Sequence, residues 1–230
     1  MTNALILFAI LPMAGKTKNR LMPFLSAEEC MSLYSSFLKD VYEKARASCA
    51  DIYVFFTPRD RKDEFKKLLG GDAVLLPQYG EDLGQKMKNA LGAVLRMGYD
   101  KVVLMGTDIP HIHTETIKNA FDSLNTRDIV IHPALDGGYY LIGMKQEHDS
   151  IWNIKRYGTN TVMYDTLQHI KAENLSISVG QMYYDIDCKE DLKQLWNDIK
   201  HGAVCNCPET MAFLETLQHK LESQSKEKKK

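Results

Sequence analysis

The 230-residue sequence lacks an excess of charge of either sign, because 29 Lys and Arg residues stand against 30 Asp and Glu residues, for a formal net charge of -1. Proteins that bind nucleic acid through its phosphates usually carry a strong positive balance, so nucleic acid is not an expected partner. Four of the Lys residues lie in the final KEKKK. We therefore expect a slightly acidic domain over residues 1–222 and a disordered basic tail over residues 223–230.

Long apolar runs are lacking as well. The apolar start, ALILFAIL at 4–11, has eight residues and no basic segment before it. A membrane-spanning helix needs about 20 apolar residues, and a signal peptide begins with a basic segment, so neither is predicted. The five Cys residues are an odd number without framework-like spacing, which favours reduced thiols in a cytoplasm. Cys205 and Cys207, with Cys188, form a weak alternative thiolate metal site, because their spacing is tighter than that of usual zinc ligands.

No internal repeat and no linker rich in Pro, Gly or Ser divides the chain, so we expect a single domain. Short apolar runs have the length and composition of strands buried on both faces, at 4–11, 51–57, 73–77, 101–106 and 128–134. Amphipathic segments of helix length separate them, including those at about 60–69, 83–97 and 114–124. This alternation predicts an α/β fold with a mostly parallel central sheet, flanked by helices on both faces.

The first amphipathic segment carries the clearest local signals. Ser26 and Glu29 form a capping box, and a stripe with a spacing of four follows, made of Leu33, Phe37, Val41 and Ala45. After residue 134 the pattern changes to the glycine-punctuated run 136–144, which predicts a strand pair or an edge strand. A helix is expected to start near Thr159 with its hydroxyl as N-cap, and another after Asp187.

Ligands of such sheets bind outside the carboxyl ends of the strands, and a basic loop follows the first predicted strand. The segment LPMAGKTKNRL, residues 11–21, holds Gly15 together with Lys16, Lys18 and Arg20. Its backbone N–H groups and cationic side chains can hold a di- or triphosphate. The spacing is not that of a Walker loop. The alternative interpretation is an exposed basic loop.

An aspartate ends another predicted strand, in the stretch GTDIPH at residues 106–111. Asp108 can bind Mg²⁺ or Mn²⁺, which take oxygen ligands and accept phosphate oxygens at open positions. Because Asp and Pro favour turns, a purely structural role is the alternative. One carboxylate rarely fixes a divalent ion alone, and the candidate partners are Asp136, Asp185 and Asp187. His111 and His113 lie near but are more often incidental at such a turn.

Glycines and aromatic residues give less specific signals. Gly137 and Gly138 would let a substrate approach the backbone closely, or they form a bulge or tight turn. Phe55, Phe56 and Tyr79 can stack on a base, although aromatic residues in and after strands belong more often to the core.

The order of these segments resembles a known bacterial family, the selenodomain-associated or arsenosugar-biosynthesis glycosyltransferases, which belong with the GT-A-type nucleotide-diphospho-sugar transferases. The similarity runs from FAILPMAGKTKNRL through GEDLGQKM, YGTNTVMYDTL and DIDCKEDL to CPETMAFL, and its specific parts are GTDIP and DGGYYLIG. The chain departs from the family pattern at Ile10, where the family usually has Lys. Loss of that cation would weaken nucleotide binding or signal a changed donor.

The resemblance implies a role for each motif residue. It implies phosphate or nucleotide binding by Gly15, Lys18 and Arg20, and a Mg²⁺ or Mn²⁺ site at Asp108 and Asp187. It leaves Asp136 as the catalytic base or an acceptor contact, with acceptor binding by Gly137, Gly138 and Tyr139.

The function expected on this basis is that of a metal-dependent transferase acting on a nucleotide-activated substrate. The first interpretation is a glycosyltransferase that uses a nucleotide-diphospho-sugar. The alternatives are a nucleotidyltransferase acting on a small phosphorylated acceptor and a nucleotide-binding protein that has lost catalysis.

Overall fold

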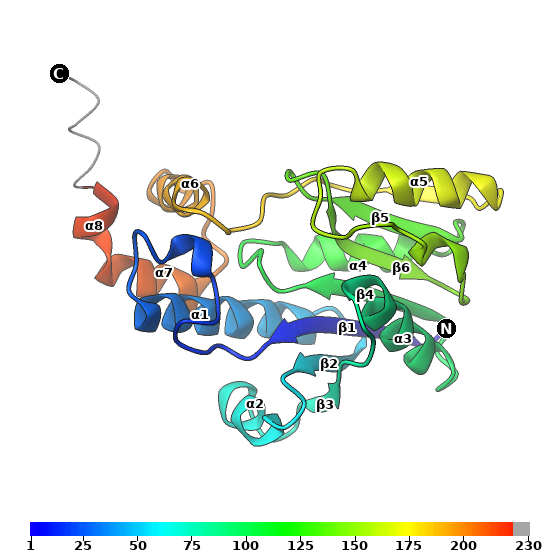
Figure 1. The fold of residues 1–230 in the computed structure, drawn as a ribbon, viewed down its shortest axis with the longest axis horizontal. Helices are drawn as coiled ribbons and strands as arrows, with labels where there is room; N and C mark the ends of the chain where they lie inside the picture. The colour runs from blue at the N-terminus through cyan, green and yellow to red at the C-terminus, as the bar shows by residue number, and fades with distance from the viewer. Residues whose placement is uncertain (223–230) are drawn as a thin grey trace.

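Seven strands form the sheet of the computed structural model, which describes residues 1–222 (Figure 1). They are β1 (Asn3–Ile10), β2 (Asp51–Thr57), β3 (Val74–Pro77), β4 (Lys101–Gly106), β5 (Ile129–Pro133), β6 (Tyr139–Met144) and β7 (Ile177–Val179). The order across the sheet is β3-β2-β1-β4-β6-β5-β7. Only β6 runs antiparallel to its neighbours β4 and β5, and the other pairs are parallel.

Helices cover both faces of this sheet. They are α1 (Ala27–Arg46), α2 (Lys62–Leu69), α3 (Leu83–Leu95), α4 (Thr114–Ser123), α5 (Val162–Ala172), α6 (Lys189–Lys200), α7 (Pro208–Thr216) and α8 (Gln218–Glu222), with short 3₁₀ turns η1 (Asn19–Leu21) and η2 (Ser150–Trp152). One apolar core lies under α1, α2, α4, α6 and α7, and the other lies under α3, α5 and η2. Side chains of β1 alternate between the cores, since Leu5 and Leu7 enter the first and Ala4 and Ile6 the second.

The sequence-based predictions for the first part of the chain are confirmed. The predicted strands begin and end within one residue of the observed β1 to β5. In the capping box of α1, the N–H of Glu29 donates to the Ser26 hydroxyl at 3.1 Å, and the N–H of Ser26 donates to Oε2 of Glu29 at 2.7 Å. The predicted stripe of Leu33, Phe37 and Val41 is fully buried.

In the second half, one prediction is wrong, one strand was missed and one prediction is not tested. Thr159 is not the N-cap of α5, because the chain first makes a turn with Gly158 at φ 75° and the helix begins only at Val162. The Thr159 hydroxyl instead donates to the Arg156 carbonyl at 3.2 Å. Strand β7 was not predicted, since three residues are too few for a periodic signal. The predicted basic tail lies outside the described residues.

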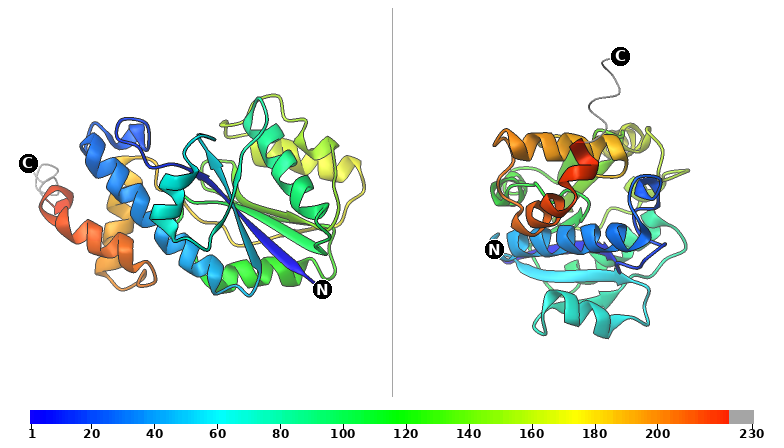
Figure 2. Two further views of the ribbon diagram at one scale, coloured as in Figure 1. Left: turned by 90° about the horizontal axis from the view of Figure 1, so that it is seen from below. Right: turned by 90° about the vertical axis from the view of Figure 1, so that its left-hand side faces the viewer.

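The C-terminal helices close one end of the molecule. Figure 2 shows α6, α7 and α8 beside α1, beyond the carboxyl end of β1. Helix α7 is tied to α1 by Asp40, whose carboxylate accepts the N–H groups of Glu209 and Thr210 at 3.1 and 2.8 Å. The segment before α6 lies against the end of β4, where the N–H of Ile186 donates to the carbonyl of Asp108 at 3.1 Å. Within residues 1–222, no helix combines the length and apolar character that a membrane crossing would need.

Candidate functional site

The basic loop folds so that one of its cations turns inward. Thr17 is buried, and its hydroxyl bonds both the N–H and the carbonyl of Met13 at 2.7 and 2.8 Å. The next residue, Lys18, takes a left-handed backbone conformation with φ 52°, which is uncommon for a residue with a side chain. Its side chain is only 6% exposed, whereas that of Arg20 is 75% exposed. The side chain of Lys18 therefore points into the protein, and that of Arg20 points into solvent.

The Lys18 ammonium lies between two aspartates of the predicted site. Nζ is 2.5 Å from Oδ1 of Asp108 and 2.8 Å from Oδ1 of Asp187. It also lies 5.7 Å from the ring centre of Tyr34, close enough for a cation–π interaction. Burial opposes the charged form, but the two carboxylates outweigh it and raise the pKa of Lys18. The site thus contains a fully charged, buried ammonium.

Hydrogen bonds at Asp108 and at its neighbour Thr107 fix the end of β4 in place. The Asp108 carbonyl accepts the N–H of Ile186 at 3.1 Å, which couples the end of β4 to the segment that carries Asp187. The preceding Thr107 hydroxyl lies 2.7 Å from the hydroxyl of Tyr34 on α1. The Tyr34 oxygen also accepts the N–H of Ile10 at 3.3 Å. One tyrosine therefore links the carboxyl ends of β1 and β4.

The acidic side of the site is incompletely neutralised. Asp187 precedes α6 and lies 3.7 Å from Arg20; burial opposes its ionisation, but Lys18 outweighs that and lowers the pKa of Asp187. Burial and neighbouring carboxylates, above all Asp108, raise the pKa of Asp185 to about 7. The carboxylates at this end therefore repel one another despite the Lys18 charge.

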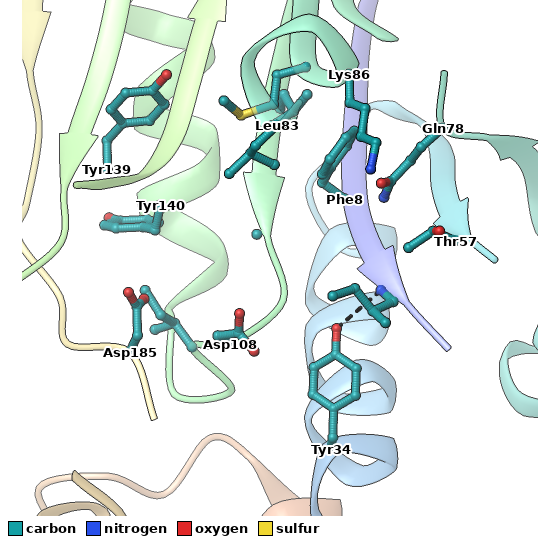
Figure 3. A pocket seen from close by; sticks show the side chains of 15 residues that line it. Phe8, Tyr34, Thr57, Gln78, Leu83, Lys86, Asp108, Tyr139, Tyr140 and Asp185 are labelled. Carbon is teal, nitrogen blue, oxygen red and sulfur yellow. Dashed lines mark hydrogen bonds between the residues drawn. The ribbon is translucent and has the colours of Figure 1, made fainter. Parts of the chain in front are cut away.

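A cavity of about 370 Å³ opens beside these groups (Figure 3). Its walls come from the ends of β1, β4 and β6, from α1 and from the start of α3. They comprise Phe8, Ile10, Tyr34, Thr57, Gln78, Leu83, Lys86, Met87, Leu104, Gly106, Asp108, Ile109, Tyr139, Tyr140 and Asp185. Figure 3 shows Asp108 and Asp185 on one side, and Phe8, Gln78 and Lys86 on another. The cavity thus offers an acidic part and a separate part with one cation and an amide.

The other predicted residues take different places. Gly15, at φ 73°, lies exposed on the basic loop. Asp136 is exposed and does not line the cavity, because its Oδ1 accepts the N–H of Gly138 at 2.9 Å in a tight turn. A Cβ on Gly137 would come within 2.3 Å of the Asn160 backbone, so close packing by itself explains that glycine. Tyr139 lines the cavity.

The weaker candidates have structural roles. The His111 ring is buried against Tyr184, with ring centres 4.5 Å apart, and burial lowers its pKa to about 4. His113 is the residue before α4. All five cysteines are free. Phe55 and Phe56 are core residues, and Tyr79 is exposed beneath the Arg59 guanidinium.

Sequence reasoning missed most of the cavity wall, including Phe8, Tyr34, Gln78 and Lys86. Gln78 directly follows β3, so the rule that ligands bind at carboxyl strand ends would have found it. Lys86 lies within α3 and Tyr34 within α1. Their positions on helix faces carry no signal that separates them from ordinary surface or core residues.

The chemistry of the carboxylates fits a hard divalent cation, since Asp108, Asp185 and Asp187 offer only oxygen ligands. Burial, and after it the neighbouring carboxylates, raise the pKa of Asp185, and a bound cation would offset the contribution of those carboxylates. In residues 1–222, however, no group of three or more His, Cys, Asp or Glu side chains is already arranged to hold a metal. Lys18 provides the cation between Asp108 and Asp187, so a metal would share these carboxylates with it.

Known proteins support the class that this fold and site define, an enzyme of the nucleotide-diphospho-sugar transferase-like superfamily. A protein of Desulfovibrio desulfuricans, named provisionally as a nucleotide-diphospho-sugar transferase, superposes with a TM-score of 0.92 and 30% identity, over 97% of this chain and 98% of that chain. The chain belongs to the family described as uncharacterized proteins conserved in bacteria (DUF2064), whose model matches residues 41–159. Asp108 and Asp136 lie within the matched part, and Lys18 and Asp187 lie outside it.

One sequence relative and one structural neighbour give further information. A protein of Methanobrevibacter smithii, named 2-phospho-L-lactate guanylyltransferase, is 28% identical over 94% of this chain and 93% of its own length. A protein of Mycobacterium tuberculosis, solved in complex with manganese, has a TM-score of 0.50 and 15% identity, over 85% of this chain and 98% of that chain. The second likeness shows a shared fold alone. The chain is therefore a transferase, and the relatives favour nucleotidyl transfer over the glycosyl transfer predicted first.

Proposed function

We propose that this protein is a nucleotidyltransferase that acts on a small phosphorylated acceptor. In this reaction a phosphate oxygen of the acceptor attacks the α-phosphorus of a nucleoside triphosphate. The bond from that phosphorus to the bridging oxygen breaks, and pyrophosphate leaves with both electrons of the bond. The product is a diphosphate that is esterified at one end by the nucleoside and at the other end by the acceptor. The name of the guanylyltransferase relative supports this reaction type.

The observation that carries the proposal is the buried Lys18 ammonium, which does not line the cavity itself but forms an ion pair with Asp108, a residue of the cavity wall. A triphosphate placed there meets a cation that is charged at every physiological pH, because its carboxylate partners raise its pKa. Negative charge grows on the leaving pyrophosphate in the transition state, and a fixed ammonium stabilises it without reorganisation. Arg20 and the backbone N–H groups near Gly15 add donors from the same loop.

The carboxylates would hold a divalent metal next to Lys18. Asp108 and Asp187 are the proposed ligands, with Asp185 as a third oxygen donor. When bound, Mg²⁺ or Mn²⁺ would neutralise part of the triphosphate charge. The manganese complex of the Mycobacterium tuberculosis fold relative supports a metal of this kind.

Asp136 bears on the choice between nucleotidyl and glycosyl transfer. A sugar acceptor has a neutral hydroxyl that needs a base, whereas Asp136 does not line the cavity and accepts the Gly138 N–H with one of its two oxygens. A phosphate acceptor is already ionised near neutral pH and needs no base. The geometry of Asp136 is thus compatible with a phosphorylated acceptor.

A coupled assay tests the proposal. The full chain is incubated with Mg²⁺, each of the four nucleoside triphosphates and a set of small phosphorylated carboxylic acids and sugar phosphates. Pyrophosphate release is measured, and the product is identified by ³¹P NMR. We expect acceptor-dependent pyrophosphate release and a new diphosphate diester signal. Transfer from a nucleotide-diphospho-sugar to a hydroxyl, with no pyrophosphate from any triphosphate, would show that the chain is a glycosyltransferase.

A further inference from the structure

The Gln78 amide presents an acceptor of fixed orientation to the cavity. Its side chain is 4% exposed, and Nε2 donates to the carbonyls of Ala9 and Phe55 at 3.1 and 2.9 Å. Since carbonyl oxygens only accept, the amide nitrogen must face them, and Oε1 must point away. No group among residues 1–222 donates to that oxygen. The cavity wall therefore contains an acceptor that lacks a partner.

Lys86 supplies a donor to the same cavity. It lies on α3 and, within the described part of the chain, forms no ion pair. The other lysine near it on this helix, Lys88, is neutralised by Asp149 at 2.9 Å. The side chain of Lys86 is partly exposed, and because an ammonium only donates hydrogen bonds, it can donate to an acceptor on a ligand in the cavity. Figure 3 shows Lys86 and Gln78 with the Phe8 ring on one side of the cavity, apart from Asp108 and Asp185.

We propose that Lys86 and Gln78 read the base of the nucleotide and select guanine. This inference rests on the proposed nucleotidyl transfer, because it assigns the second part of the same cavity to the base. The free oxygen of Gln78 needs an N–H, and guanine provides N1–H. Lys86 can donate to acceptors, and guanine provides O6 and N7 side by side. The Phe8 ring offers a flat apolar surface for the base.

The other bases match this pair less well. Adenine and cytosine carry an amino donor where guanine has O6, so the Lys86 ammonium would meet N–H groups there. Uracil shares the adjacent carbonyl and N–H but has no N7 beside the carbonyl. Inosine keeps O6, N1–H and N7 and lacks only the 2-amino group. We therefore expect the highest affinity for GTP and ITP, a lower affinity for UTP, and the lowest for ATP and CTP.

Lys86 is the better residue for a test, because Gln78 also joins β1 to β2 and its loss would disturb folding. Affinities of GTP, ITP, UTP, ATP and CTP are measured by calorimetry with Mg²⁺ for the wild type, Lys86→Met and the matched control Lys88→Met. Both variants remove one positive charge from α3. We expect Lys86→Met to lose about tenfold in affinity for GTP and ITP, and less than about twofold for ATP. Lys88→Met should keep the wild-type order.

The possible failures are distinguishable. If Lys86→Met lowers the affinity for all five nucleotides equally, Lys86 binds phosphate and its assignment to the base is wrong. The proposed nucleotidyl transfer would still stand. If the wild type binds ATP as tightly as GTP, the selection of guanine is wrong in the same way. If the wild type binds no nucleotide at all, the proposed function fails and this inference fails with it.

Discussion

The Lys18 ammonium lies 2.5 Å from the carboxylate of Asp108, and this pair joins the loop after β1 to the end of β4. Replacing Lys18 with Met should lower the rate of pyrophosphate release about 100-fold or more, because a preorganised cation at the leaving group is lost. Steady-state kinetics measure the effect. The control is Lys16→Met, which removes an exposed lysine of the same loop. Equal losses in the two variants would mean that net charge, and not the position of Lys18, determines the rate.

Asp108→Asn should abolish the increase in melting temperature that Mn²⁺ causes in the presence of a nucleoside triphosphate. An amide keeps the shape of the side chain but loses the charge that a divalent cation needs. Differential scanning fluorimetry with and without Mn²⁺ measures it. The exposed Asp122→Asn on α4 is the control and should respond like the wild type. An unchanged Mn²⁺ response in Asp108→Asn would exclude Asp108 as a ligand.

Gly137→Ala should destabilise the protein more than Gly98→Ala, although both residues have positive φ, 89° and 94°. The backbone strain is similar in the two variants, but only the Cβ at position 137 meets another segment, 2.3 Å from the Asn160 carbonyl oxygen. The extra cost should be about 1–3 kcal/mol, as for other overpacked sites. Urea unfolding gives both values. Equal losses would show that the loop around Asn160 moves aside freely.

Acidification should reduce stability through the buried His132. Burial lowers its pKa to about 4, below the unfolded value of about 6.5. Between these pH values the unfolded chain binds more protons, so the free energy of unfolding falls as the pH falls from 6.5 toward 4. The contribution is on the order of 3 kcal/mol at most. In His132→Gln, which does not titrate, the decrease measured by urea unfolding should be smaller. If the free energy of unfolding of His132→Gln decreased as much as that of the wild type, a group other than His132 would be responsible.

The fold was predictable wherever a local pattern determines the structure. The stripe of Leu33, Phe37 and Val41 is buried because a helix with that spacing has one apolar face. The apolar runs became strands because both of their faces are covered. Thr159 was misassigned because a threonine hydroxyl suits a turn as well as an N-cap, and the choice depends on the packing of the neighbouring loop.

The site was predictable only in part. Asp108 was found because strand ends in such sheets face the ligand. The ion pair between Asp108 and Lys18 was not predicted, because the local sequence gives no sign that Lys18 takes a left-handed conformation with its ammonium turned inward. Lys86 was missed because sequence position does not tell which side of α3 meets the cavity.

The sequence by itself determined the alternation of strands and helices, the single domain and the strand-end position of Asp108, since these follow from hydrophobic periodicity and short-range hydrogen bonding. Only the tertiary structure decided that Lys18 lies between Asp108 and Asp187 and that Lys86 and Gln78 share one cavity. These contacts join segments far apart in the chain, and they form only when the sheet and its covering helices have packed.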